Sequence, residues 1–287
     1  MGFQKFLSRS WDEHGAQTAA VAKELPRGIE LITQSEDIAP MAALITHVMG
    51  QHLARWNDGI LLLEKLKRIA AFQPGSEAEK AVSRGIAILR TASGDAQSLP
   101  FFTPTEQIRV MAGVAAALID HELARAQKYF LDAVEKAGEL DPQDPGVRAL
   151  AIAGNNMAQA LEDLPDRSAA QIELMILAAE AARKHWGIAG GWLEVERAEY
   201  RLAMSYLKAG DLNQALIHAK QCLDVCRKND APEVEMFFAH EALALVQRQR
   251  QNVEAFSEAM DKMRELFQIL TPEDRQWCRS TFDKFLN

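Results

Sequence analysis

The sequence predicts an all-α protein, and three observations lead to this fold class. Apolar residues recur at three- and four-residue spacings along nearly all of the 287 residues, as they do along one face of an α-helix. Ala, Leu, Glu, Lys, Arg and Gln, which favour helices, dominate the composition. No segment sustains the alternation of apolar and polar residues that is typical of a half-buried strand.

The first hundred residues contain four predicted helices. We place them at residues 12–25, 38–53, 58–72 and 77–92, separated by turn-forming residues such as Gln73-Pro74-Gly75. We expect residues 1–100 to be a diverged helical region that is continuous with the rest of the chain.

Residues 101–270 contain four predicted pairs of helices. The pairs cover residues 105–136, 147–186, 196–223 and 237–270, and they begin roughly 40 residues apart. Thr103-Pro104 marks the first start, because a hydroxyl followed by proline is typical of a helix N-terminus. Ala153-Gly154-Asn155 is the expected point of close packing in the second pair. Thr271-Pro272 starts one more helix, so we expect residues 271–287 to form a C-terminal capping helix.

The third pair has the most specific pattern. A leucine and a small residue let two helices approach closely, an aromatic ring fills the space beside them, and Gly-Asp ends the first helix so that the second can fold back. These features fall on Leu202, Ala203, Tyr206, Gly210, Asp211, Leu212 and Ala215. The spacing resembles the tetratricopeptide repeat, whose signature is W-x-x-L-G-x-x-Y, then A-x-x-x-F, then P. The chain departs from it at Glu199, Ala219 and Arg227, which stand where the signature has Trp, Phe and Pro.

The resemblance implies an α-solenoid of tetratricopeptide-like hairpins wound into a right-handed superhelix. In such proteins the first helix of each hairpin lines a concave groove that often clamps a peptide. The positions that the resemblance assigns to the groove are Arg148, Asn155, Gln159, Arg197, Tyr200, Arg201, Lys208, His240, Glu241, Gln247 and Arg248. They are mainly basic, and paired hydrogen bonds from Arg and Asn suit a carboxylate, so we expect an acidic peptide. The alternative is that they form ion pairs between helices, with Glu173, Glu194, Glu196 and Glu199 as partners.

The sequence contains no residue pattern that is typical of an active site. It has no phosphate-binding loop, no dinucleotide-binding glycine motif and no nucleophile elbow. His52 and Trp56, four residues apart, can stack on one helix face, whereas we expect His47 to point elsewhere. We interpret both histidines as packing or surface residues, and we expect no catalytic residues, no metal ion and no cofactor.

The composition limits the kinds of binding partner and the cellular compartment that we expect. A net charge of -8 argues against binding to nucleic acids or to anionic membrane surfaces. The three cysteines are too few for a disulfide framework, and we interpret them as reduced core thiols. The N-terminal residues lack the apolar stretch of a secretory signal, and no apolar run is long enough to span a bilayer. We expect a cytoplasmic protein.

These features predict a non-catalytic scaffold that holds a protein or peptide partner in the groove. Two other classes stay open: a regulatory module that senses a small ligand or a peptide, and a helical enzyme with a dispersed active site. A homodimer also stays open, formed by exposed members of an aromatic group near the C-terminal end. This group is Phe237, Phe238, Phe267, Trp277, Phe282 and Phe285.

Overall fold

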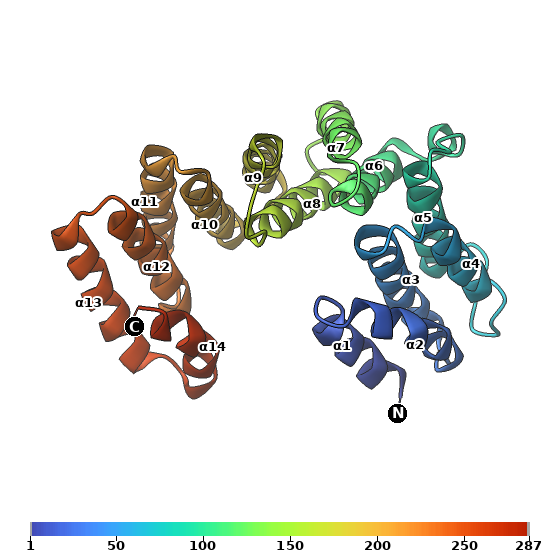
Figure 1. The fold of residues 1–287 in the computed structure, drawn as a ribbon, viewed down its shortest axis with the longest axis horizontal. Coiled ribbons are helices and arrows are strands. Elements are labelled where there is room, and N and C mark those ends of the chain that lie inside the picture. Colours follow the sequence, from blue (N-terminus) through green and yellow to red (C-terminus); the bar gives the residue numbers. More distant parts are fainter. Residues whose placement is uncertain (1, 286–287) are drawn as a thin grey trace. The chain divides into compact units, whose positions relative to one another are not determined.

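The computed structural model describes residues 2–285, and all regular elements within them are helices, as expected (Figure 1). The chain divides into two compact units between Ala153 and Gly154, within helix α8 (Pro145–Glu162). Residue 100, where the expected N-terminal region meets the expected repeats, lies inside the first unit, and the division falls farther along the chain. None of the described helices is long and apolar enough to cross a membrane.

The first unit is a series of short and medium helices. Its elements before α8 are α1 (Phe3–Glu13), α2 (Thr18–Glu30), η1 (Ser35–Asp37), α3 (Ile38–Thr46), η2 (His47–His52), α4 (Trp56–Leu66), α5 (Glu77–Ala92), η3 (Leu99–Phe101), α6 (Pro104–Leu118) and α7 (Leu123–Ala137). The helix predicted at residues 77–92 matches α5 at both ends. The helix predicted at residues 12–25 is wrong, because α1 ends and α2 begins within that range. Gly15 lies in the intervening turn, where its low helix propensity favours the break.

η2 continues α3 as a π-helical turn. In a π-helix the backbone hydrogen bonds join residues five apart instead of four, so the turn is wider than that of an α-helix. Gly50 lies in this turn, and a Cβ atom there would come 2.8 Å from Leu89 Cδ2 of α5. A larger residue at position 50 would therefore push the turn away from α5. The wider turn also changes which side chains of the segment share a face.

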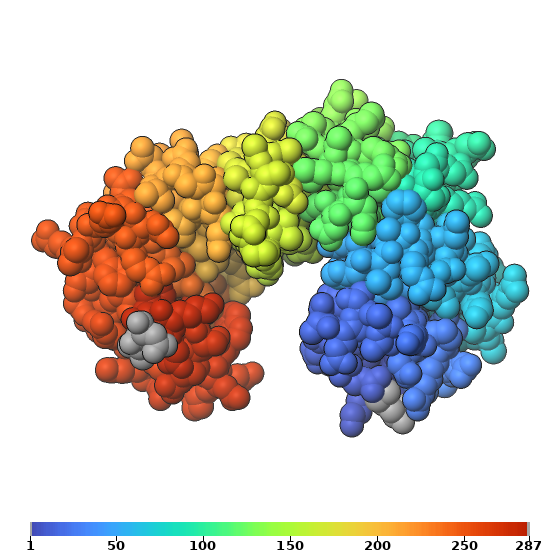
Figure 2. All heavy atoms as spheres, viewed as in Figure 1, coloured from blue at the N-terminus to red at the C-terminus, as the bar shows by residue number. Residues whose placement is uncertain are grey.

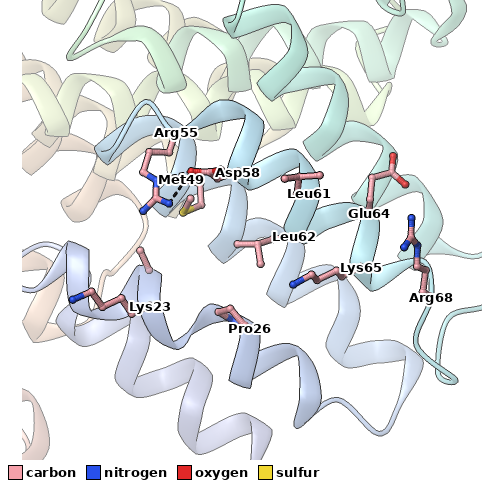
Figure 3. A pocket seen from close by; sticks show the side chains of 11 residues that line it. Lys23, Pro26, Met49, Arg55, Asp58, Leu61, Leu62, Glu64, Lys65 and Arg68 are labelled. Carbon is pink, nitrogen blue, oxygen red and sulfur yellow. Dashed lines mark hydrogen bonds and ion pairs between the residues drawn. The ribbon is translucent and has the colours of Figure 1, made fainter.

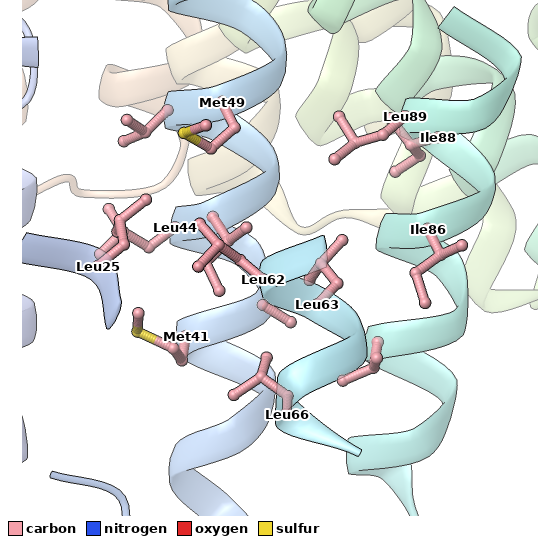
Figure 4. Packing of buried hydrophobic residues seen from close by; sticks show 14 of the residues in the cluster. Leu25, Met41, Leu44, Met49, Leu62, Leu63, Leu66, Ile86, Ile88 and Leu89 are labelled. Atoms are coloured by element: carbon pink, nitrogen blue, oxygen red, sulfur yellow. The ribbon is translucent and has the colours of Figure 1, made fainter. Parts of the chain in front are cut away.

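The first unit has its own apolar core. Fully buried leucines from successive helices meet in it, among them Leu25 of α2, Leu44 of α3, Leu63 of α4 and Leu89 of α5. Figure 4 shows side chains of these helices pointing into the space between them. Burying one such side chain stabilises the fold by about 1.5–3 kcal/mol, so this core holds α1 to α7 together.

The second unit is built from longer helices packed in consecutive pairs. After α8 come α9 (Ala169–Ala189), α10 (Trp192–Ala209), α11 (Leu212–Lys228), α12 (Glu233–Gln249), α13 (Val253–Ile269) and α14 (Pro272–Asp283). α9 packs on α10, α10 on α11, and α12 on α13. The predicted capping helix corresponds to α14, and the last two residues of the chain lie outside the described residues.

The turn between α10 and α11 has the geometry that its sequence predicts. Gly210 has a φ of 82°, the left-handed conformation that glycine adopts most easily, and it ends α10. Asp211 caps α11, because its side chain accepts hydrogen bonds from the backbone N–H groups of Asn213 (3.2 Å) and Gln214 (3.0 Å). Ala203 of α10 and Ala215 of α11 are fully buried where the two helices pack.

An aromatic cluster forms the core at the C-terminal end of the second unit. Phe237 is fully buried, and the rings of Phe267 and Phe282 stack with their centroids 4.4 Å apart. Trp277 is 61% exposed, although its ring lies 5.0 Å from that of Phe238. Figure 2 shows that side chains fill the space that the ribbon drawing leaves open between these helices.

Candidate functional site

Polar contacts join α10 to α12 in the second unit. Arg197 forms an ion pair with Glu235 (Nη2–Oε1 2.5 Å), and the Tyr200 hydroxyl donates a hydrogen bond to Glu241 Oε2 (2.7 Å). Burial and the neighbouring Glu241 carboxylate raise the pKa of Tyr200 well above its usual value, so the phenol stays a donor. These contacts occupy three of the expected groove positions.

A second set of contacts joins α10 to the end of α8. Arg201 forms an ion pair with Glu162, and its guanidinium also donates to Gln159 Oε1 (3.2 Å). The Ser205 hydroxyl donates to the other carboxylate oxygen of Glu162 (2.6 Å). Arg197 and Arg201 are therefore both matched by acids of the same chain. This is the kind of arrangement that the ion-pair alternative describes, but with Glu162 and Glu235 as the partners.

Four further expected positions are on α8, α10 and α12. Arg148 is exposed and belongs to the first unit, while Asn155 is half-buried and Lys208 is exposed in the second. Arg248 is exposed and lies over the ring of Phe285, 5.2 Å from its centroid. The structure thus brings five of the expected residues into contacts within the second unit: Gln159, Arg197, Tyr200, Arg201 and Glu241.

A buried ion-pair network surrounds Glu199 of α10. Glu199, which is 3% exposed, forms ion pairs with Arg183 of α9 and with His218 of α11 (Oε2–Nδ1 2.7 Å). Burial alone would raise the pKa of Glu199, but the hydrogen bonds from His218 and Arg183 outweigh it and lower the pKa. The ring of Tyr206 stacks on His218 with centroids 5.4 Å apart. Three consecutive helices are therefore joined around one carboxylate.

A groove between α11 and α13 crosses α12 and contains two of the expected positions. It has a volume of about 420 Å³, and its lining includes His240 and Gln247. Both side chains are buried, at 6% and 9% exposed. His240 Nδ1 and Gln247 Oε1 have no hydrogen-bond partner among the residues that the structure describes. Burial lowers the pKa of His240 to about 4, so its imidazole is neutral at physiological pH.

The walls of this groove combine apolar and charged side chains. Leu223 of α11 and Leu243 of α12 are apolar lining residues. The other lining residues are Lys220, Asp224, Arg227, Ala255, Glu258 and Ala259. The two basic and two acidic side chains among them balance in charge, so the groove favours neither an acidic nor a basic ligand.

Another groove lies in the first unit, between α2 and α4. It has a volume of about 480 Å³, and Figure 3 shows Lys23 and Pro26 of α2 facing Leu62 and Lys65 of α4. At one end Arg55 pairs with Asp58 (2.7 Å), as the dashed line in Figure 3 marks. Unlike the groove along α12, its lining contains no buried polar atom that lacks a partner within residues 2–285.

Three histidines of the first unit meet in space. His47 Nε2 and His52 Nε2 are 3.0 Å apart, and the His14 ring lies 4.8 Å from that of His47. The expectation that His47 points away from His52 is wrong, because the π-helical turn places residues five apart above one another. The sequence reasoning also missed His14, because the predicted helix at 12–25 concealed the turn in which it lies.

Comparison with known proteins adds no family. A scan of the chain against protein-family models gives no match, and a search of curated proteins gives none either.

Proposed function

We propose that the helical pairs are tetratricopeptide-like repeats that stack as an α-solenoid, and that the chain is a non-catalytic scaffold for a protein or peptide partner. The segment 196–223 supports the repeat assignment: Leu202, Ala203 and Ala215 are buried where the signature has its packing residues, and Gly210 is left-handed. The three cysteines are free and buried, which fits a reducing compartment such as the cytoplasm.

The observation that carries the binding function is the pair of unpartnered polar atoms in the groove along α12. A buried polar atom without a hydrogen bond costs about 1–3 kcal/mol. Rotation of the His240 and Gln247 side chains that lets His240 Nδ1 and Gln247 Oε1 bond to a ligand in the groove would therefore recover this free energy. The two residues are seven apart and share a helix face. A peptide backbone offers N–H and C=O groups at such intervals, and Leu223 and Leu243 offer apolar contact for its side chains.

An acidic segment bound to α10 is a second candidate. Arg197 is 58% exposed although it pairs with Glu235, so its guanidinium can still reach a carboxylate from outside. This candidate agrees with the acidic peptide expected from the sequence, whereas the charge-balanced groove along α12 does not require an acidic ligand.

Selection of peptides from a random display library on the whole chain tests both candidates. The selected peptides would be measured by calorimetry against Gln247→Leu, which removes the acceptor at nearly constant volume, and against Gln249→Leu as control. Gln249 is exposed on the same helix. We expect Gln247→Leu to weaken binding at least tenfold and Gln249→Leu to leave it unchanged.

The other outcomes separate the candidates. Acid-rich peptides that lose affinity with Arg197→Glu but not with Gln247→Leu would move the site to α10. If no selected peptide responds to either substitution while circular dichroism shows folded variants, the proposed binding surface is wrong.

A further inference from the structure

Two separate segments of the first unit bring the three histidines together. His14 lies in the turn between α1 and α2, while His47 and His52 are the first and last residues of the π-helical turn η2. Each offers one ring nitrogen, and these three atoms all lie within 4.8 Å of one another. All three side chains are half-buried, so a small ion can reach them from solvent.

Hydrogen bonding selects the tautomer of the neutral His14 ring that can bind a metal. His14 Nδ1 lies next to the backbone carbonyl of Trp11, and since a carbonyl only accepts, Nδ1 must carry the proton. In the neutral ring Nε2 then has a free lone pair. A backbone carbonyl that holds one ring nitrogen is the usual support of a metal-binding histidine, because it orients the ring.

The distances suit a tetrahedral ion after a small adjustment. Zinc–nitrogen bonds of about 2.0–2.1 Å at tetrahedral angles place two ligand nitrogens about 3.3 Å apart. His47 Nε2 and His52 Nε2 are already at 3.0 Å, so they need to separate by only a few tenths of an ångström. His14 must approach them by more than this through rotation of its side chain, because its backbone carbonyl accepts a hydrogen bond from the Thr18 hydroxyl (2.6 Å).

The set consists of three imidazole nitrogens and leaves room for a fourth ligand. Imidazole suits Zn²⁺, Cu²⁺ and Ni²⁺, whereas Ca²⁺ and Mg²⁺ need oxygen ligands, which the trio lacks. His47 also lines a cavity of about 300 Å³ whose walls include Gly85 and Gly113. We propose that His14, His47 and His52 bind one zinc-class transition-metal ion and leave its fourth position to water or a small ligand.

Calorimetric titration of the whole chain with Zn²⁺ tests the site, using protein without a histidine tag and stripped by a chelator. Wild type should bind one Zn²⁺ per chain. His14→Ala, His47→Ala and His52→Ala should each weaken binding by at least about 100-fold, since loss even of a supporting partner costs about 10–100-fold. Co²⁺ should give the intense visible absorption of a tetrahedral site, and one equivalent of Zn²⁺ should abolish it.

His121→Ala is the matched control. His121 Nε2 donates to the Gln51 carbonyl (2.8 Å) and is not one of the three proposed ligands, so this variant should bind Zn²⁺ like wild type. If circular dichroism shows that His47→Ala or His52→Ala does not fold, the affinity of His14→Ala for Zn²⁺ tests the proposal instead, because residue 14 lies outside both neighbouring helices. Either no Zn²⁺ binding by wild type or wild-type affinity in folded His14→Ala would overturn the assignment.

Discussion

Single residues show how the second unit uses carboxylates inside its helical packing. Glu196 and Glu199 lie on α10 and are 1% and 3% exposed. Glu199 accepts hydrogen bonds from Arg183 and His218, whereas Glu196 accepts one from the Cys222 thiol at 2.9 Å. Glu196 Oε2 has no partner in the described part of the chain. Partners therefore decide the direction of the pKa shift: lowered for Glu199, and raised by burial to about 7 for Glu196.

Glu196→Gln should stabilise the protein in alkaline but not in acidic solution. Because its folded-state pKa is raised from 4.5 to about 7, the native state holds a proton that the unfolded state has lost between these values, so its contribution to stability falls as pH rises through this window. Glutamine imitates the protonated form. We expect little difference from wild type near pH 4.5 and a gain of up to about 3 kcal/mol at pH 8, from about 1.4 kcal/mol per pKa unit. Urea denaturation of wild type and variant at both pH values measures this difference in the free energy of unfolding.

Glu199→Gln is the control for this measurement, and its effect on the free energy of unfolding at pH 8 should have the opposite sign. Glu199 contributes to stability as an ionised partner of Arg183 and His218, so its replacement should destabilise the protein at pH 8. Equal responses of the two variants at pH 8 would contradict the assignment of a raised pKa to Glu196.

At the scale of helices, close packing depends on single glycines. Gly154 of α8 faces α9, where an added Cβ would lie 2.7 Å from the Ala178 carbonyl oxygen and 3.2 Å from Ala182 Cβ. Backbone atoms cannot move aside as a flexible side chain can. The Ala153-Gly154-Asn155 segment is thus a point of close helix approach, as its sequence predicts.

Gly154→Ala should destabilise the second unit by about 1–3 kcal/mol, because the helices must separate to make room. Gly187→Ala is the control within α9. There the added Cβ would meet only the end of the flexible Arg183 side chain at 3.0 Å, so the better helix propensity of alanine should give up to about 1 kcal/mol of stabilisation. Thermal unfolding followed by circular dichroism compares them. A neutral Gly154→Ala would show that α8 and α9 are not packed this closely.

The sequence predicted the helices well where caps and periodicity agree, and it failed where the backbone departs from the α-helical repeat. The starts of α6 and α14 follow from Thr103 and Thr271, whose side chains cap these helices. Nothing in the residues 47–52 signals a π-helical turn, so the meeting of His47 and His52 could not be predicted. The ion-pair partners of Arg197 and Arg201 could not be predicted from the sequence either. Packing between helices that are distant in the sequence brings Glu235 to Arg197 and Glu162 to Arg201.

At the scale of the whole molecule, each unit has an apolar core of its own. The core of the first unit draws on α1 to α7, and the aromatic core around Phe237 draws on α12 to α14. Separate cores predict that damage to one of them changes the stability of that unit first.

Phe237→Ala should therefore cost about 3–5 kcal/mol and remove hydrogen-exchange protection mainly from α12, α13 and α14. Phe237 is fully buried and its ring contacts those of Phe267 and Phe282. Phe101→Ala serves as control, since Phe101 is 89% exposed and its loss should cost less than about 0.5 kcal/mol. Mass spectrometry of exchanged peptides reports the location of the change. Equal loss of protection across the first unit would show that the whole chain unfolds as one.

The π-helical turn also bears on how the chain tolerates changes of length. Such a turn holds one residue more than an α-helical turn, so deletion of one residue between His47 and His52 would leave regular α-helix with the histidines four apart. Residues four apart share a face of an α-helix, and the helix beyond would keep its phase. An insertion at the same place cannot be absorbed by a return to regular α-helix, so it would rotate one histidine away from the other. Homologous chains one residue shorter here could therefore keep the pair, whereas longer ones would lose it.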